Sequence, residues 1–572
     1  MLSSPHSFKP RSLLPAIFRA LACLGFSLLP ASAFAQTNIV NVTFPRSLPS
    51  SALANVVQDN FLGISFELSS FDTLWGESPM LMPNAMQNYL SNLRARITHP
   101  LRIRIGGNSM DGSTFVPDQT QMIILTDPNA YYNDVPVDFG PTFFDVLNAM
   151  ADDVGEMQFM IGLSMRDPAH DTNVITLANA AKEMLGYRLD AMLLGNEPDL
   201  YAGHGTRQGY TMSDYIPEIG HMLYDLNSSF TGEPLGDPIV GGPSVCCDWN
   251  LDDLFSAGLT EYPYKYYTMQ HYPTYSCQGP TPQNTNISYF LSHTNVPAFA
   301  SWQQTGVQLA KQQGVPVLMT EYNTVSCGGS NISDTFAAAL WAVDTGLQFA
   351  SVGINGAYLH TREYQVTYNL FDPPTPQTST QAGWRTGSPY YAALFLSEAF
   401  SPNGSIVVDL DIGHSMTDPI STVAGYAIFD ASGTTLERLA LINYDLSQTQ
   451  TFAFIPPNTT DSITIRILMA PSVEERSEIS WAGQRVAGNG DLEGAQSTLY
   501  VDCGGRGVCE VDVPGPGAAL VVFGGSPEAS GFWEGNSTIA GVQGYASGAL
   551  RMVKAMHALL WMIVLASIGV LI

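Results

Sequence analysis

Apolar runs that fit buried strands alternate with helix-like stretches between about residue 57 and residue 400. The eight candidate strands are residues 62–67, 101–105, 158–163, 190–194, 238–241, 266–271, 315–320 and 353–360. The helix-like segments are residues 141–153, 173–185, 213–225, 302–313 and 334–350. Strands that are apolar on both faces and separated by helices favour a parallel sheet. Eight such units predict an α/β fold, a (β/α)8 TIM barrel with long loops.

A doubly wound sheet is the competing interpretation of this alternation. That fold would need a glycine-rich phosphate loop after an early strand. Residues 103–108 are glycine-rich, but they lack the G-x-G-x-x-G spacing. The barrel is therefore the preferred fold.

The pattern changes after about residue 402, where short strands alternate with Gly, Pro and Asn turns. These strands are residues 422–430, 436–444, 451–455, 461–468, 497–501 and 518–523. They predict a C-terminal all-β sandwich domain over residues 402–525, after a catalytic barrel over residues 57–401. Residues 36–56 are expected to contribute a strand to the sandwich, and residues 526–548 form a Gly/Ser-rich linker.

Both ends of the chain carry targeting patterns. Lys9 and Arg11 precede an apolar stretch at residues 21–29, and Ala33 and Ala35 follow it, so residues 1–35 are expected to be a signal peptide. At the other end, a spacer with three basic or histidine residues separates small residues at 547–549 from an apolar tail at 558–572. That tail is shorter than the roughly twenty residues of a spanning helix. Residues 549–572 therefore predict a GPI-anchor signal, and with it a secreted protein held at the cell surface.

The alternative for the C-terminal segment, a tail-anchored helix, conflicts with an N-terminal signal peptide. Sequons and cysteines agree with secretion. The sequons begin at Asn41, Asn227, Asn286, Asn331, Asn403, Asn458 and Asn536. Without Cys23 of the signal peptide, an even six cysteines remain. Cys503 and Cys509 are expected to pair, whereas the pairing among Cys246, Cys247, Cys277 and Cys327 stays open.

The net charge of -28 excludes some partners. An acidic field of this size repels nucleic acid and highly sulfated polymers. No C-x-x-C or histidine-rich spacing suggests a metal site, and every cysteine has a plausible structural partner. No cofactor or metal is therefore expected, and the membrane is a partner only through the predicted anchor.

Two of the candidate barrel strands lead into glutamates. Glu197 follows the fourth strand within Asn196-Glu197-Pro198, and Glu321 ends the seventh. Burying a lone carboxylate costs several kcal/mol, so such residues are expected where a strand emerges into a cleft. The ends of the fourth and seventh strands face each other across a barrel mouth, which allows the ~5–5.5 Å separation of a retaining glycosidase. The alternative is that either glutamate only pairs with an arginine at a strand end.

The two carboxylates would take different roles. Glu197 is the expected acid/base, because Asn196 beside it can bond a sugar 2-hydroxyl and Pro198 fixes the turn. Glu321 is the expected nucleophile, and Arg104 is expected to orient it, although Arg104 could equally be an interior salt-bridge residue.

The order of these motifs resembles glycoside hydrolase family 79, the β-glucuronidase and heparanase family. The matching segments are G-I-S-F-E at residues 63–67, R-I-G-G-N-S at 104–109, G-N-E-P-D at 195–199, T-E-Y-N at 320–323, C-G-G-S at 327–330 and V-P-G-P-G-A at 513–518. Asn-Glu-Pro alone marks only the larger clan, whereas the glycine segment after Glu321 is specific to the family. Glu67 and Asn108, which lie in the first two of these segments, are added to the expected substrate-binding residues.

The resemblance implies that backbone amides of Gly328 and Gly329 bind a uronic carboxylate, together with Tyr364 or Tyr368. It also implies that Tyr272 holds the nucleophile. Amides in a tight turn can bind an anion without any arginine. Alternatively, Gly328 and Gly329 form only a surface turn, and Tyr272 is only part of an aromatic rim around a sugar cleft.

The acidic charge disfavours long sulfated substrates, so the expected activity is that of an exo-acting β-glucuronidase. Its substrate would be terminal glucuronic acid, or the 4-O-methyl form, on a glycan. One alternative is a sister enzyme of the clan: a β-xylosidase, arabinofuranosidase or β-glucosidase. Another is a non-catalytic glycan-binding protein of the cell surface.

Overall fold

The computed structural model describes residues 39–127, 129–130, 135–229, 238–362, 366–374, 383–457, 460–504 and 507–524. The predicted signal peptide and the predicted anchor signal lie outside these residues and stay predictions. Tyr364 also lies outside them. Within the described residues, no helix has the length and apolar character needed to cross a bilayer.

Eight parallel strands close into a barrel, which confirms the predicted fold. In chain order they are β3 (Leu62–Glu67), β4 (Leu101–Gly106), β8 (Met157–Leu163), β9 (Leu189–Leu194), β10 (Val240–Val245), β11 (Tyr266–His271), β12 (Val317–Tyr322) and β13 (Gly356–Thr361). Nearly every residue of these strands is buried, because one face lines the barrel interior and the other meets helices. Glu197 therefore follows the fourth barrel strand, and Glu321 lies in the seventh.

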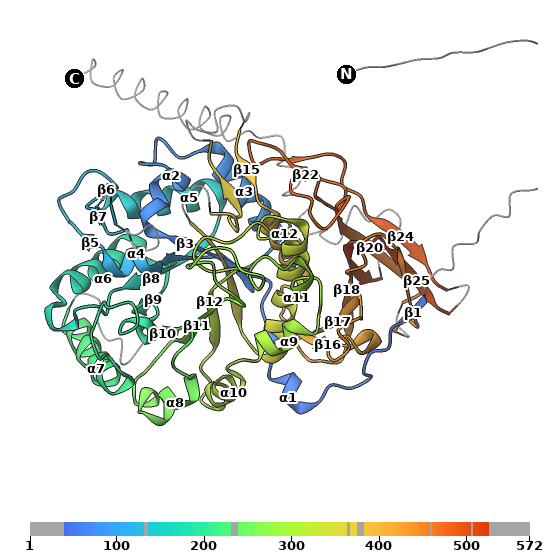
Figure 1. Ribbon diagram of the computed structural model, residues 1–572, viewed down its shortest axis with the longest axis horizontal. Coiled ribbons are helices and arrows are strands. Elements are labelled where there is room, and N and C mark those ends of the chain that lie inside the picture. Colours follow the sequence, from blue (N-terminus) through green and yellow to red (C-terminus); the bar gives the residue numbers. More distant parts are fainter. Residues whose placement is uncertain are drawn as a thin grey trace, which may run out of the picture. The chain divides into compact units, whose positions relative to one another are not determined.

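Helices surround the barrel (Figure 1). The longer ones are α3 (Asn84–Arg94), α5 (Thr142–Val154), α6 (Thr172–Leu185), α7 (Met212–Asn227), α8 (Leu251–Ser256), α9 (Asn295–Ala300), α10 (Gln304–Gln312), α11 (Phe336–Val352) and α12 (Ser388–Ala399). Shorter ones are α1 (Ser50–Leu53), α2 (Phe71–Trp75) and α4 (Gly107–Gly112). Small sheets decorate the connections: β5 (Thr114–Phe115), β6 (Ile123–Leu125) and β7 (Val137–Phe139), β14 (Phe371–Asp372) with β15 (Arg385–Thr386), and β22 (Arg485–Val486) with β23 (Leu492–Glu493).

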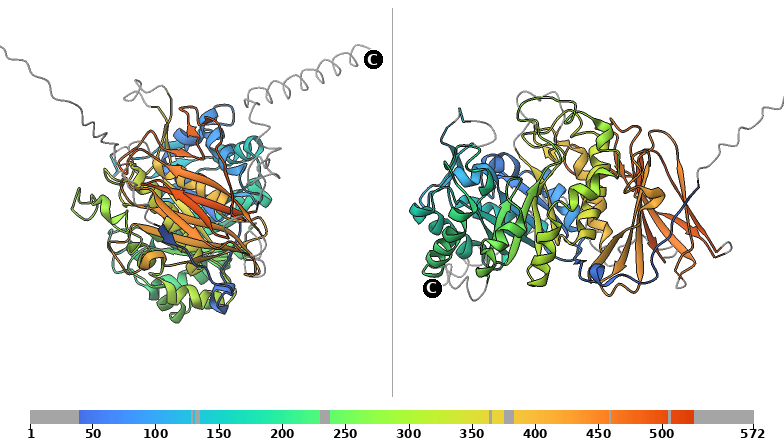
Figure 2. Two further views of the ribbon diagram at one scale, coloured as in Figure 1. Left: turned by 90° about the vertical axis from the view of Figure 1, so that its right-hand side faces the viewer. Right: turned by 60° about the horizontal axis from the view of Figure 1, so that its bottom comes forward.

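The C-terminal domain consists of two packed sheets, drawn mainly in orange and red (Figure 2). The larger has the order β2 (Val56–Val57), β16 (Ser405–Asp409), β17 (Val423–Asp430), β18 (Leu436–Asn443), β26 (Gly517–Phe523), β20 (Ser462–Met469) and β21 (Ser480–Trp481), with β24 (Leu499–Asp502) beside β20. The smaller contains β1 (Ile39–Asn41), β19 (Gln450–Phe454) and β25 (Cys509–Val513). The N-terminal strands β1 and β2 thus pair with strands of this domain.

Two helices without a polar face join the barrel to the sandwich. Residues 336–350 of α11 are all buried, and so is every residue of α12. One continuous apolar core contains barrel strands, both helices and one face of the larger sheet. These two helices have no solvent-facing side and are covered on both sides, so even their few polar residues are buried.

The junction also contains buried charge. His293, which precedes α9, contacts Asp344 of α11 at 2.9 Å and Asp409 of β16 at 3.0 Å. The hydroxyl of Tyr444 donates to Asp344 at 2.6 Å, and that of Tyr426 donates to it as well. Burial alone would lower the pKa of His293, but the two aspartates raise it to about 10. The histidine is therefore a buried cation that ties the sandwich to the barrel.

We expect His293→Gln to destabilise the protein, because Asp344 would stay buried without its cation. Breaking a buried pair in this way costs about 3–5 kcal/mol. The contribution of His293 is complete below its unfolded pKa of 6.5 and is lost as pH rises through about 10. The unfolding free energies of wild type and variant, measured in urea, should therefore differ most at about pH 6 and converge near pH 10.

The control is His221→Gln, since the His221 side chain is 52% exposed. It should change the unfolding free energy by less than about 0.5 kcal/mol. A constant difference between wild type and His293→Gln across this pH range would contradict the assigned charge.

Candidate active site

Glu321 is held at the barrel mouth by two donors from other strands. Nη1 of Arg104, on β4, donates to Oε2 at 2.8 Å, and the Tyr272 hydroxyl, just after β11, donates to Oε1 at 2.8 Å. The residue is only 8% exposed. Both carboxylate oxygens are engaged, so the side chain is fixed in one orientation. The pKa of Tyr272 is raised well above 10 by burial and by the charge of Glu321, so Tyr272 remains a neutral donor.

Glu197 stands beyond the end of β9 in a left-handed conformation, with a φ of 48°. This conformation costs a non-glycine residue about 1–2 kcal/mol, so the surroundings must impose it. Its backbone amide donates to the carbonyl of Ser244 at 3.2 Å, and Pro198 begins the short helix η5 (Pro198–Leu200) directly after it. The strand-to-helix turn thus fixes the backbone of Glu197 just past the end of β9.

The environment of Glu197 favours its protonated form. Burial raises the pKa of Glu197 well above 4.5, and the negative charges of Glu321 and Asp199 raise it further. Arg104 opposes this shift, but it is already bonded to Glu321. Two carboxylates whose environments differ in this way are the usual basis for an acid and a nucleophile in one site.

Asn196 joins the two glutamates through a network of amides. Its Oδ1 accepts from Nη2 of Arg104 at 2.6 Å, and its Nδ2 donates to Oδ1 of Asn108 at 2.9 Å. Gln270 of β11, which sequence analysis did not single out, lies between Asn196 and Glu197. With its amide oriented to match its neighbours, its nitrogen donates to Oε1 of Glu197 at 3.2 Å and its oxygen accepts from Nη2 of Arg104 at 3.1 Å.

Glu67 is linked to Glu321 through His360. Its Oε1 accepts from the amide of Ser109 at 2.7 Å, and His360 lies 3.5 Å from Glu67 and 3.8 Å from Glu321. Burial alone would raise the pKa of Glu67, but the charge of Arg362 and bonds from His360 and Ser109 lower it to about 2. A Cβ on Gly107, whose φ is +83°, would lie 2.2 Å from this carboxylate, so only glycine fits there. Glu67 is thus a fixed negative charge.

The glycine turn after β12 lies against the loop that follows β13. Gly328 and Gly329 have φ values of 96° and 82°, and the carbonyl of Gly328 accepts from the amide of Thr367 at 3.0 Å. Tyr368 is buried, with its ring 6.2 Å from that of Tyr272. The structure therefore brings the glycine turn, Tyr368 and Tyr272 together on the side of Glu321. Tyr364 lies outside the described residues.

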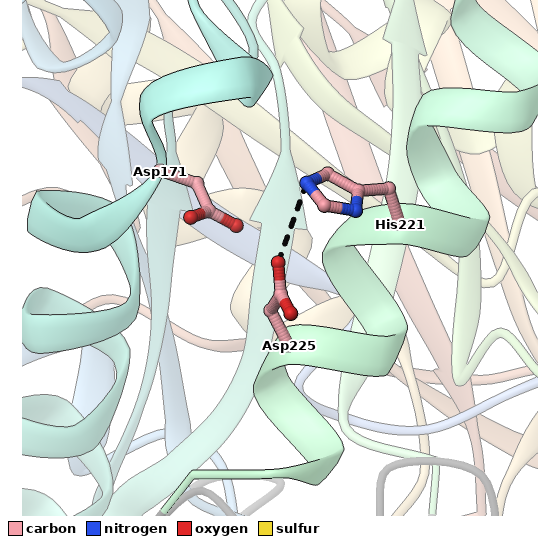
Figure 3. Close-up of side chains that lie close together, drawn as sticks. All are labelled: Asp171, His221 and Asp225. Atoms are coloured by element: carbon pink, nitrogen blue, oxygen red, sulfur yellow. Dashed lines mark ion pairs between the residues drawn. The ribbon is translucent and has the colours of Figure 1, made fainter.

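A separate trio could hold a metal ion. Asp171 at the start of α6 and His221 and Asp225 of α7 offer ligand atoms within 4.8 Å of one another (Figure 3). Nε2 of His221 lies 3.3 Å from Oδ2 of Asp225. Among the described residues, none of these three contacts a residue of the site at the barrel mouth. We assign the trio no part in the chemistry of that site.

Similar proteins agree with this architecture. Residues 425–520 match the glycosyl hydrolase family 79 C-terminal beta domain. A beta-glucuronidase from Neurospora crassa is 26% identical over 77% of this chain and 81% of its own. One from Aspergillus niger is 25% identical over 83% of this chain and 92% of its own.

Solved structures share the fold. A 4-O-alpha-L-rhamnosyl-beta-D-glucuronidase from Fusarium oxysporum superposes with a TM-score of 0.70 at 22% identity, covering 85% of this chain and all of the other. A family 51 arabinofuranosidase from Xanthomonas axonopodis superposes with a TM-score of 0.58 at 14% identity, covering 86% and 100%.

A (β/α)8 barrel that presents two carboxylates at the ends of its fourth and seventh strands, followed by a β-sandwich, is a glycoside hydrolase architecture. The matching C-terminal domain and the similar proteins point to one family within the glycoside hydrolases. These matches support glycoside hydrolase family 79.

The raised pKa of Glu197 can be tested without a substrate. Glu321→Gln removes the larger of the neighbouring charges that raise the pKa of Glu197, so this pKa should fall. Carbon-13 NMR titration of labelled glutamate carboxyls would follow it directly. Glu67→Gln is the matched control, because Glu67 raises the pKa of Glu197 less than Glu321 does. Equal shifts in the two variants would contradict the proximity of Glu197 and Glu321.

Proposed function

We propose that this protein is a retaining exo-β-glucuronidase that releases terminal β-linked glucuronic acid, or its 4-O-methyl form, from glycans. The observation that carries the proposal is the contrast between the two glutamates. Arg104 and Tyr272 donate to both carboxylate oxygens of Glu321, whereas burial and neighbouring negative charge raise the pKa of Glu197. The curated relatives named beta-glucuronidase support the sugar.

In the first step, the Glu321 carboxylate attacks the anomeric carbon and a glycosyl-enzyme ester forms. Glu197 donates its proton to the glycosidic oxygen as the bond to the aglycone breaks. Asn196 is placed beside Glu197 to bond the sugar 2-hydroxyl, a contact that strengthens in the transition state. Because Glu197 must be protonated, this step slows as pH rises through its pKa, and the upward shift extends activity to higher pH.

In the second step, Glu197 is a carboxylate and acts as base. It takes a proton from water, which attacks the anomeric carbon and releases Glu321. Gln270 can donate to the ionised Glu197 in this state. Two inversions give net retention of configuration.

The glycine turn supplies the binding site for the sugar carboxylate in this proposal. Backbone amides of Gly328 and Gly329 form an anion site without a cation, and the Tyr368 side chain closes it. The turn lies against Thr367 and Tyr368, and the ring of Tyr368 is 6.2 Å from that of Tyr272, which donates to Glu321. A sugar without a carboxylate would leave these donors unpaired, which costs about 1–3 kcal/mol for each buried group.

The charges at the barrel mouth favour an exo-acting enzyme over one that binds sulfated chains. Arg104 is paired with Glu321, and Arg166 lies 3.4 Å from Asp111. Arg362 acts on Glu67. Each of these arginines is thus matched by a carboxylate and does not present free positive charge to a polyanion.

The catalytic roles predict the behaviour of two variants. We expect Glu321→Gln to reduce kcat on an aryl β-glucuronide by more than about 10³-fold with the fold intact. Glu197→Gln should reduce kcat/KM mainly for substrates with poor leaving groups, because those need the proton most. Proton NMR of the first product formed should show retained configuration. An aryl β-glucoside, β-xyloside or α-arabinofuranoside turned over faster than the glucuronide would identify a sister enzyme instead, and no turnover of any glycoside would identify a binding protein.

The carboxylate site predicts a change of specificity. A Cβ on Gly329 would lie 2.2 Å from Oγ1 of Thr367, and the φ of +82° disfavours any other residue. We therefore expect Gly329→Ala to displace the turn and to lower kcat/KM for the glucuronide at least about tenfold, while the weak β-glucoside rate changes less. Gly314→Ala is the matched control, since Gly314 also has positive φ but has nothing within 4 Å of its Cβ position. An equal loss on both sugars would argue against a carboxylate contact at this turn.

A further inference from the structure

Two adjacent cysteines, Cys246 and Cys247, are bonded to each other directly after the fifth barrel strand, β10. The other pairs are Cys277 with Cys327 and, as predicted, Cys503 with Cys509. A bond between neighbours closes no long loop, so it restrains the chain far less globally than the other two bridges do. Its effect must therefore be local.

The local effect falls on the acid/base loop. Three consecutive backbone amides of this turn point at the carboxylate of Asp199: those of Cys246, Cys247 and Asp248 lie 3.1, 2.8 and 2.9 Å from Oδ2. Asp199 is 4% exposed and lies two residues after Glu197. Amides that converge on one carboxylate form a strong anion-binding turn. Here the bound anion is the Asp199 carboxylate of the same chain.

The same segment also holds Glu197 from the other side. The amide of Glu197 donates to the carbonyl of Ser244 at 3.2 Å, and Ser244 is itself left-handed, with a φ of 55°. Ser244 is anchored in turn by Thr268 of β11, whose hydroxyl accepts from the Ser244 amide at 2.9 Å. Residues 244–248 therefore contact the backbone amide of Glu197 and, two residues later, the side chain of Asp199. Glu197 lies between these contacts, and its strained backbone needs such support.

We propose that the turn closed by the Cys246–Cys247 disulfide is a positioning element for general-acid catalysis, which holds Glu197 in place through Asp199. The inference rests on the proposed function and extends it to residues that do not touch the substrate. Opening the disulfide relaxes the turn, disperses the three amides and lets the Glu197 loop move, while Glu321 and its donors stay in place.

The test compares two substrates that differ in their need for an acid. Methyl β-glucuronide has a poor leaving group, whereas β-glucuronyl fluoride has a leaving group that departs without protonation. For the double variant Cys246→Ser/Cys247→Ser, we expect kcat/KM on the methyl glucuronide to fall at least about tenfold, and on the fluoride to change less than about twofold. The pH limb that reports Glu197 should also shift.

A matched disulfide control is available in the sandwich. Cys503→Ser/Cys509→Ser also removes one bridge, and it should leave the ratio of the two substrates unchanged. Asp199→Ala removes the contact with the three amides but keeps the disulfide. It should reproduce the selective loss on the methyl glucuronide. Asp199→Asn retains one acceptor oxygen and should restore part of the activity.

The outcomes separate this inference from the function on which it rests. Wild-type protein that cleaves neither glucuronide contradicts the proposed function. Wild-type activity combined with equal losses on both substrates in the cysteine variant, or with no loss, contradicts the positioning role. If the cysteine variant does not fold, Asp199→Ala and Asp199→Asn decide together, because both remove the charge that raises the pKa of Glu197 and only Asn keeps an acceptor for the three amides. A selective loss on the methyl glucuronide that is larger for Ala than for Asn supports the role, and any other pattern overturns it.

Discussion

The buried guanidinium of Arg104 is the interaction on which the site depends. It is 1% exposed and bonds to Glu321, to Asn196 and, at 3.0 Å, to the hydroxyl of Ser65. A buried cation must be compensated by partners, and a planar fork can reach several at once. These partners come from the first and seventh barrel strands and from the turn after the fourth. One side chain therefore holds Glu321 and Asn196, the residue beside Glu197, in a common frame, which a closed barrel keeps rigid.

Buried charge appears a second time where the barrel meets the sandwich. Glu398 of α12 accepts from Arg96 and Arg466 at 2.7 Å each and from the indole of Trp481 at 3.0 Å. The His293 cluster provides a similar contact at α11. Apolar packing has little directionality, whereas such bonded charges accept few alternative arrangements. We interpret them as fixing how the two domains dock, while the continuous apolar core supplies most of the stabilisation.

The sequence predicted the parts of this structure that leave a periodic signal. Each barrel strand was located within a few residues, because runs buried on both faces differ clearly from their polar connections. Helix α12 was not predicted as an element: it is buried on all sides and has no amphipathic face to detect. The short strands β16 and β25 were missed for lack of a strong pattern. The partners Gln270 and His360 lie far in sequence from the glutamates they serve, and only the closed barrel brings them together. Asp199 is only two residues from Glu197, but its contact with residues 246–248 likewise depends on the fold.

The two glutamates look alike in the sequence, and the difference between them lies in what surrounds each. Glu321 sits within a strand, where Arg104 and Tyr272 reach it from neighbouring parts of the barrel and engage both oxygens. Glu197 sits beyond its strand in a strained turn, and its backbone amide is held by Ser244, near the end of the next strand. A nucleophile benefits from a fixed orientation, whereas an acid/base must gain and lose a proton without losing its position. The same fold meets both needs by bonding one carboxylate directly and restraining the other through its backbone and through Asp199.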